Sequence, residues 1–456
     1  MKLQLQKMKR LVSSPSRMIA ISFAAVILTG TLLLMLPISS KEHIVTPFLD
    51  CLFTATSATC VTGLIVYDTF THWSTLGQCI ILSLIQIGGL GLVTLTTFFS
   101  ILIGKKLGLR GMHLAQESVS SMGSDITMLI KTVISTALIV ETAGALLLMS
   151  VFIPQYGADG IFISVFTSVS AFCNAGFDLM GRQTPFISLS NYNDSPMVIG
   201  VVGLLIIIGG IGFIVIHDFL QYHKSKTLTL HTRIVLVVTG VLILLGMLMT
   251  IAGEWDNPLT LGKLPTTAQK LGAAWFHSVS CRTAGFNTIP MESLTNFTKI
   301  LSSVLMFFGA APGSTGGGIK CTTVAVIFMT VYSVVRGDED TIIFRRKVEK
   351  SAVYKSMAVM ILGILAVTVT SGCIVATMKE THAVTGVDAL FESVSAFATV
   401  GLSAGISAEA NPLSKFLLIF SMYIGRLGPV SFFLSLAMRS TPNRKQIIPE
   451  GKIQIG

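Results

Sequence analysis

Long apolar runs alternate with short polar segments along the whole chain. A transmembrane helix needs about 20 consecutive apolar residues. Eight runs approach or exceed that length, and the sixth is interrupted; they cover residues 18–36, 76–103, 126–153, 197–219, 233–252, 298–335, 352–377 and 413–438. The pattern predicts an all-α integral membrane protein with eight transmembrane helices.

Between the two apolar runs of each quarter lies a diverged copy of one short segment. The copies are rich in Phe, Ser and Ala and end in Gly followed by Leu or Phe; they span residues 53–64, 166–177, 276–286 and 391–402. Their glycines recur every 109 to 116 residues, and the third copy is one residue shorter than the others. We therefore expect four imperfect pseudo-repeats of helix, re-entrant pore loop and helix around one central pore. The expected units are 18–103, 126–219, 233–335 and 352–438, followed by a cytoplasmic C-terminal tail, 439–456.

Composition and charge set the orientation. Hydrophobic residues make up 52% of the chain and charged residues 12%, against about 25% charged residues in soluble domains. The stretches on the side of the two termini hold 21 Lys and Arg, and the opposite stretches hold 8. The positive-inside rule then places both termini in the cytoplasm of a multi-pass plasma-membrane protein. The net charge of +10 is thus interpreted as topology rather than nucleic-acid binding.

The residues before each glycine are uncharged, and they suit a cation filter. Glycine adopts backbone angles closed to other residues, and rings of carbonyl oxygens can replace the water shell of a potassium ion. Thr399-Val400-Gly401 resembles the filter sequence of potassium channels. We expect K⁺ at the backbone carbonyls of Val61, Thr62, Gly63, Asn174, Ala175, Gly176, Thr283, Ala284, Gly285, Thr399, Val400 and Gly401. The alternative is that these glycines only permit close packing or turns.

The sixth apolar run is broken by a polar, glycine-rich segment. Proline removes a helix donor, and each glycine costs about 1 kcal/mol relative to alanine inside a helix. The segment comprises Gly309, Ala310, Ala311, Pro312, Gly313, Ser314, Thr315, Gly316, Gly317, Gly318, Ile319 and Lys320. It is predicted to be a gate that blocks the path below the filter and swings aside; a passive helix break is the alternative. Nucleotide binding is not expected, because Ile319 stands where a phosphate-binding loop requires Lys.

Charged residues inside the apolar runs are few. A transmembrane arginine is costly, and we hypothesise that Arg426 pairs with carbonyls of the 309–318 segment and repels cations while the gate is closed. A structural tie between helices is the alternative. Lys320 lies nearer the cytoplasm and could snorkel. Glu141 fits a polar seam or a dimer contact, and for His277 and Glu392 a local hydrogen bond is favoured over ion binding.

Five sequence motifs add a resemblance to this picture. They are Leu34–Pro37, Phe53–Ala58, Ile85–Gly89, Arg282–Phe286 and Gly425–Pro429. In these motifs the chain resembles the membrane subunit of a Ktr-type bacterial potassium uptake system, in the Trk/Ktr/HKT superfamily. The resemblance implies a homodimer, an intramembrane gating loop, stimulation by Na⁺, and potassium selectivity from Gly63, where serine favours sodium.

The same resemblance implies a separate partner. Ktr-type subunits sit on a cytosolic ring that binds nucleotides and controls opening. We therefore expect no cofactor in this chain and nucleotide only on the partner, with 336–347 as a solvated loop or docking segment.

These observations favour inward transport of K⁺ down its electrochemical gradient. An enzyme is not predicted, because the spans contain neither a nucleophile–base set nor a metal cluster. A sodium-selective or poorly selective translocator remains an alternative, as does a non-conducting membrane scaffold.

Overall fold

The computed structural model describes residues 15–91, 94, 126–182, 184–378 and 384–436. The expected tail 439–456 and the basic stretches at the N-terminus and around 104–125 lie outside the described residues. Helices dominate the rest, and one two-residue antiparallel hairpin pairs β1 (Ile342–Ile343) with β2 (Arg346–Lys347). The prediction of an all-α protein is therefore confirmed for the described chain.

Each quarter of the chain begins with a long helix, which is followed by a shorter helix and then by further helices. The first quarter holds α2 (Pro15–Leu34), η1 (Pro37–Ser39), α3 (Phe48–Cys60), α4 (Thr69–His72) and α5 (Thr75–Leu90). The second holds α8 (Ile126–Tyr156), α9 (Asp159–Phe172), η2 (Ser190–Tyr192), α10 (Pro196–Gly210) and α11 (Phe213–Ser225). The third holds α12 (Leu230–Glu254), η3 (Leu261–Lys263), α13 (Thr267–Ser280), α14 (Asn296–Phe307) and α15 (Cys321–Arg336). The fourth holds α16 (Lys350–Thr377), α17 (Gly386–Ala398), α18 (Ile406–Glu409), α19 (Pro412–Leu427) and α20 (Pro429–Leu436).

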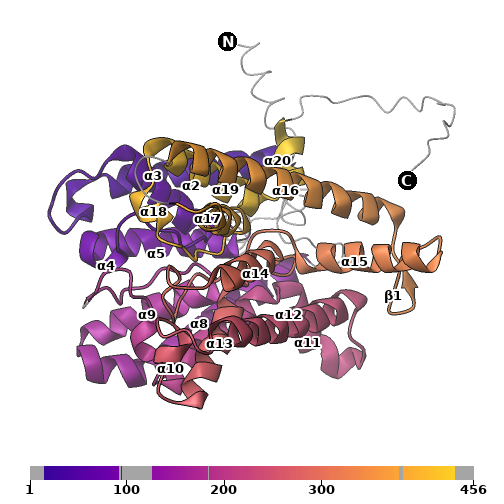
Figure 1. Ribbon diagram of the computed structural model, residues 1–456, viewed down its shortest axis with the longest axis horizontal. Coiled ribbons are helices and arrows are strands. Elements are labelled where there is room, and N and C mark those ends of the chain that lie inside the picture. The colour runs from indigo at the N-terminus through magenta and orange to yellow at the C-terminus, as the bar shows by residue number, and fades with distance from the viewer. Residues whose placement is uncertain (1–14, 92–93, 95–125, 183, 379–383, 437–456) are drawn as a thin grey trace, which may run out of the picture.

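Several helices run along the long axis of the molecule. Figure 1 shows α12, α15 and α16 along that axis, with the β1–β2 hairpin at one end and the short helices α4 and α18 at the other. Among the residues that the structure describes, four helices are long and apolar enough to cross a membrane: Arg17–Leu34, Ile130–Tyr156, Leu230–Glu254 and Lys350–Thr377. They are the first long helix of each quarter. The count of eight spans stays a prediction.

The second apolar run of each quarter is not one straight helix. The fourth predicted span, 197–219, bends by 93° between α10 and α11. At that bend Gly212 has φ +91°, and Gly91 and Gly428 have φ +82° and +83° where α5 and α19 end. These angles lie outside the right-handed helical region, so the helix stops at each of these glycines. The sixth predicted span is broken as expected, between α14 and α15.

Candidate functional site

The four glycine segments fold alike. Each follows a helix of 13 or 14 residues, namely α3, α9, α13 and α17. Two residues before each glycine the backbone is left-handed, with φ values of 58° at Val61, 58° at Asn174, 69° at Thr283 and 54° at Thr399. The glycines themselves have positive φ, 94° at Gly63, 71° at Gly176, 82° at Gly285 and 95° at Gly401. Positive φ is rare for a β-branched residue, so the repetition reflects one backbone design.

One hydrogen bond defines this conformation in all four loops. The backbone N–H before each glycine donates to a serine carbonyl near the end of the preceding helix. The donor–acceptor distances are 2.8 Å for Thr62 to Ser57, 2.7 Å for Ala175 to Ser170, 3.0 Å for Ala284 to Ser280 and 2.8 Å for Val400 to Ser395. The donor follows the acceptor by five residues in the first, second and fourth loops, and by four residues in the third loop. The missing residue is therefore absorbed within the turn, and the bond is kept.

The four loops close into a ring. A Cβ built on Gly63 would lie 2.6 Å from the carbonyl oxygen of Ala175 in the second loop. One on Gly176 would lie 2.7 Å from that of Ala284, and one on Gly285 the same distance from that of Val400. A Cβ on Gly401 would collide with the carbonyl oxygen of Thr62 and close the circle.

The residues named as a filter are thus brought together. Only glycine allows this approach of backbone to backbone, and the contacts put four carbonyl oxygens beside four glycines. The C-terminal ends of four helices also meet here, and the negative ends of their dipoles favour a cation. The eight flanking residues are fully buried; they are Val61, Thr62, Asn174, Ala175, Thr283, Ala284, Thr399 and Val400.

Asn174 is held by its own surroundings. Its amide group fits best when the nitrogen donates to the carbonyl oxygens of Ala171 and Ile206, each 3.2 Å away. The carboxamide therefore bonds to local backbone in its own loop and in α10.

The broken segment between α14 and α15 packs directly against this ring. Gly317 N donates to Thr399 Oγ1 at 3.0 Å, and Thr315 Oγ1 donates to the carbonyl oxygen of Phe172 at 3.3 Å. A Cβ on Gly316 would collide with Thr283 Oγ1. Thr315, Ala310, Ala311 and Ile319 are completely buried. The segment thus sits against the second, third and fourth loops, on the side away from the cavity described below.

The bend at Gly212 supports the same segment. Ala311 N donates to the carbonyl oxygen of Gly210 at 3.0 Å, and Phe213 N donates to that of Gly313 at 2.9 Å. The broken end of α10 supplies backbone partners that an intact helix would not offer.

Arg426 lies where the fourth quarter meets this segment. Its guanidinium donates to the carbonyl oxygens of Thr315 and, across the molecule, Gly88. The first contact is the carbonyl pairing expected from the sequence. Lys320 Nζ donates to the carbonyl oxygen of Gly316 at 2.7 Å, a hydrogen bond within the same segment. Two cationic side chains therefore bind the backbone of this segment.

Three inner-helix glycines explain how α5, α10 and α19 come so close. A Cβ on Gly88, Gly209 or Gly425 would collide with a carbonyl oxygen at the end of the neighbouring pore helix. Those carbonyls belong to Thr59, Phe172 and Phe397, each four residues before a ring glycine. The glycine-rich stretches at 88–91 and 209–212 therefore allow close packing of helix on helix. The helix ends at Gly91 and Gly212 are an additional feature.

On its other side the ring opens into a cavity of about 420 Å³. All four ring glycines line it. Acidic side chains line it as well, from Asp68, Asp178, Glu292 and Glu409. Burial, followed by the nearby charge of Asp68, raises the pKa of Asp178 to about 6. None of these acids is among the site residues predicted from the sequence. Asp178 follows Gly176 by two residues, which is the signal that could have found it.

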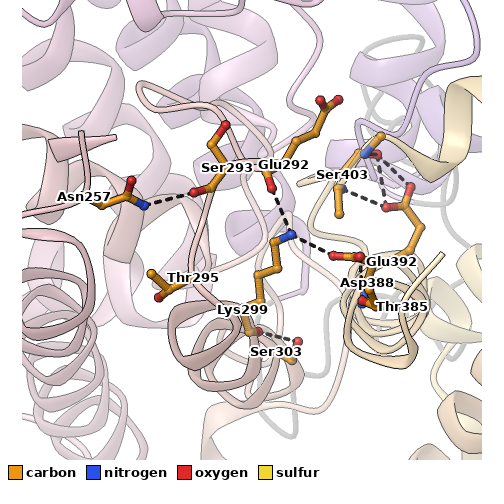
Figure 2. Close-up of polar contacts among 12 residues, drawn as sticks. Asn257, Glu292, Ser293, Thr295, Lys299, Ser303, Thr385, Asp388, Glu392 and Ser403 are labelled. Atoms are coloured by element: carbon orange, nitrogen blue, oxygen red, sulfur yellow. Dashed lines mark hydrogen bonds and ion pairs between the residues drawn. The ribbon is translucent and has the colours of Figure 1, made fainter. Parts of the chain in front are cut away.

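Hydrogen bonds and ion pairs hold the loops around the cavity mouth. Figure 2 shows Lys299 between the third and fourth quarters. Its Nζ donates to Asp388 Oδ1 at 2.7 Å and to the carbonyl oxygen of Glu292 at 3.0 Å. Glu392 accepts hydrogen bonds from Ser403 and Ser407 beyond the fourth ring glycine. Glu392 thus makes local hydrogen bonds, the role favoured from the sequence.

The other two polar residues raised from the sequence are also bonded inside the protein. His277 Nε2 lies 2.9 Å from Ser302 Oγ. Glu141 contacts Gln86, which places it in a polar contact between helices of the first two quarters. Among the described residues, no group of three or more His, Cys, Asp and Glu could hold a metal ion.

Comparisons with known proteins identify relatives of this chain. The sequence profile described as a cation transport protein matches residues 2–445. The Ktr system potassium uptake protein B of Bacillus subtilis is 38% identical over 97% of each chain. The potassium/sodium uptake protein NtpJ of Enterococcus hirae is 37% identical over 97% of each chain.

A solved structure shares the fold. The potassium transporter TrkH from Vibrio parahaemolyticus matches with a TM-score of 0.69 at 18% identity, over 92% of this chain and 83% of that one. The resemblance found in the sequence motifs is confirmed by these matches. The chain belongs to the cation transport protein family of the Trk and Ktr potassium uptake systems.

Proposed function

We propose that this chain takes up K⁺ across the plasma membrane through the ring formed by Gly63, Gly176, Gly285 and Gly401. In this proposal eight helices span the membrane, four re-entrant loops meet at the ring, and both termini lie in the cytoplasm. Transport needs no chemical step, because the membrane potential supplies about 2.3 kcal/mol per charge per 100 mV.

The observation that carries the proposal is the closed circle of backbone contacts. Four carbonyl oxygens, from Thr62, Ala175, Ala284 and Val400, each lie against a glycine of the preceding loop. Such oxygens can replace the hydration shell of K⁺. The acids of the outer cavity add a negative potential that concentrates cations at its mouth.

In the same proposal the 309–320 segment is the gate. It packs against the ring on the side away from the outer cavity, and Arg426 and Lys320 bind its backbone. Opening would release these contacts and move the segment aside. The positive charge of Arg426 beside the segment would repel a cation while the segment is in place.

Regulation would come from other polypeptides. We propose a homodimer in the membrane, seated on a cytosolic nucleotide-binding ring, with uptake stimulated by Na⁺. Ktr system proteins are among the relatives, and the name of the Enterococcus hirae relative includes both potassium and sodium. No nucleotide site is proposed in this chain.

Cation flux into proteoliposomes tests the function. Purified chain would be reconstituted with and without its cytosolic regulator, and K⁺, Rb⁺ and Na⁺ would compete for uptake. We expect K⁺ and Rb⁺ to be preferred over Na⁺. Equal or preferential Na⁺ uptake would replace the proposal by a sodium-selective or poorly selective translocator, and absence of flux even with the regulator would favour a scaffold.

A further inference from the structure

Glu141 is a buried acid that the transport pathway does not explain. It lies in α8 and is only 6% exposed. Both of its carboxyl oxygens accept from Gln86 Nε2 of α5, each at 3.1 Å. Its Oε1 also lies 3.8 Å from the Sγ of Cys173, at the end of α9. Within the described chain no Lys or Arg forms an ion pair with it.

The third quarter supplies an internal comparison. Ser168 Oγ donates to the backbone oxygen of Glu141 at 2.7 Å, and Ser278 Oγ donates to that of Ile243 at the same distance. Gly144 and Gly246, three residues further along each helix, both face these serine hydroxyls. Ile243 therefore stands in the third quarter where Glu141 stands in the second. The packing of helix on pore helix does not require a carboxyl group.

Burying a carboxyl group at membrane depth costs free energy. We therefore expect Glu141 to serve a function that offsets this cost. Its neighbours indicate which one. Cys173 directly precedes Asn174, where the second ring loop turns left-handed. Gln86 lies two residues before Gly88, whose carbonyl oxygen accepts from Arg426. A Cβ on Gly89 would lie 2.6 Å from the Sγ of Cys173, so α5 and the second loop are in close contact here.

We propose that Glu141 is a positioning residue for the second ring loop. Through Gln86 and Cys173 it ties the start of that loop to the stretch of α5 that Arg426 contacts, and so it sets the discrimination between K⁺ and Na⁺. The inference rests on the proposed function, since it assigns a role within the same filter.

The test compares three variants in the competitive flux assay. Glu141→Ala removes the tie, Glu141→Gln keeps its size and one acceptor, and Ile243→Ala removes the matching side chain of the third quarter. We expect Glu141→Ala to lower the K⁺/Na⁺ uptake ratio about fivefold, a size consistent with the loss of one ordinary buried hydrogen bond. Glu141→Gln should keep at least about half of the ratio, and Ile243→Ala should leave it unchanged.

A second measurement does not depend on transport. N-ethylmaleimide modification would be followed by mass spectrometry at Cys173, with buried Cys281 of the third loop as reference. We expect Glu141→Ala to raise modification of Cys173 about fivefold relative to Cys281, since the buried hydrogen bonds that hold the second loop are lost. Ile243→Ala should not raise it.

Failure of this inference is distinct from failure of the proposed function. If wild-type protein selects K⁺ and Glu141→Ala keeps both the uptake ratio and the protection of Cys173, Glu141 is not a positioning residue. An equal loss in Ile243→Ala would also overturn the inference, because the effect would then be one of packing. Wild-type protein without K⁺ selectivity would instead contradict the proposed function.

Discussion

At the scale of single residues, the ring depends on backbone angles that side chains rarely adopt. Val61, Asn174, Thr283 and Thr399 all have φ between 54° and 69°. A residue held in such a region costs about 1–3 kcal/mol, and it persists when its surroundings over-determine it. Here the hydrogen bond to the preceding serine carbonyl and complete burial do so. The strain falls on the four loops that we propose bind the ion.

Replacing a ring glycine should abolish selective transport. Gly401→Ala adds a Cβ at φ +95° that collides with the carbonyl oxygen of Thr62. We expect K⁺ uptake to fall by more than about tenfold, since the carbonyls must move from their binding geometry. Flux assays on folded protein check this. Gly372→Ala is the matched control, because Gly372 has no neighbour within 4 Å there, and unchanged uptake in both variants would contradict a carbonyl ring.

Asp178 should make uptake depend on external pH. Its pKa is raised to about 6, mainly by burial, so the carboxyl is charged at pH 7.5 and neutral at pH 5. We expect uptake to fall as the external pH drops through 6, because the outer cavity loses a negative charge. The stability of the protein changes with pH in the opposite direction from uptake. The stabilisation from Asp178 is fully present below its unfolded pKa of 3.8 and is lost as the pH rises through 6.

Initial K⁺ uptake at external pH values from 5 to 8 checks this expectation. Asp178→Asn should flatten the step near pH 6. Asp194→Asn, at an exposed position that does not line the cavity, should keep it. A step that survives in Asp178→Asn would assign the pH dependence to another group.

At the scale of helices, two ion pairs occupy equivalent places. Lys299 and Lys415 are the fourth residues of α14 and α19, and each pairs at 2.7 Å with the third residue of the next pore helix. Those partners are Asp388 in α17 and Asp50 in α3. The fourth quarter is thus tied to both of its neighbours in the ring.

Breaking one of these pairs should destabilise the protein strongly. In the Lys299–Asp388 pair the side chains are 8% and 18% exposed, so Lys299→Met leaves a mostly buried carboxylate without its cation. We expect a loss of about 3–5 kcal/mol, measured by thermal unfolding in detergent. Lys347→Met is the control, since the Lys347–Asp340 pair is 61% and 33% exposed and contributes at most about 1 kcal/mol. Equal losses would show that burial does not matter here.

The segment between α14 and α15 should respond to its arginine. Arg426→Gln weakens the bonds to Thr315 and Gly88. A hydrogen bond to a charged group contributes about 1.5–3 kcal/mol, so we expect K⁺ uptake without the regulator to rise about tenfold as the open state gains population. Arg336→Gln, which removes a cation stacked on the Tyr332 ring, should leave uptake unchanged. If Arg426→Gln does the same under all conditions, Arg426 is a structural tie.

At the scale of the whole molecule, four covalently linked quarters are similar without being equal. The third ring loop is one residue shorter than the other three. The 309–320 segment belongs to the third quarter, and no such segment lies in the described parts of the other quarters. Glu141 of the second quarter stands where the third quarter carries Ile243. A single chain can carry one gating segment and one buried acid such as Glu141. A ring of four identical subunits would carry four copies of each.

The proposed orientation is testable with cysteine variants in a Cys79→Ala background, since Cys79 is exposed. Glu42 and Arg345 are exposed residues in the stretches predicted to face outward and inward. A membrane-impermeant maleimide should label Glu42→Cys in intact cells and Arg345→Cys only after permeabilisation. The reverse pattern would invert the topology and make the acid-lined cavity cytoplasmic.

Much of this architecture was predictable because bilayers impose simple rules. A helix must be apolar for about 20 residues, so the long helices α2, α8, α12 and α16 are visible as runs. Glycine is needed where backbones meet, so Gly63, Gly176, Gly285 and Gly401 mark the loops. The bend at Gly212 was not predicted, because a glycine in an apolar run is compatible with both packing and a break.

The sequence by itself therefore determined the class of protein, its four related quarters and the segments that build its centre, because composition and repeat are local properties. Only the tertiary structure decided the order in which the loops touch, the position of the 309–320 segment against them, the contact of Arg426 with Gly88, and the partners of Glu141. Those contacts join residues as far apart as Gly88 and Arg426. No pattern along one chain specifies which carbonyl will face a distant side chain until the helices have packed.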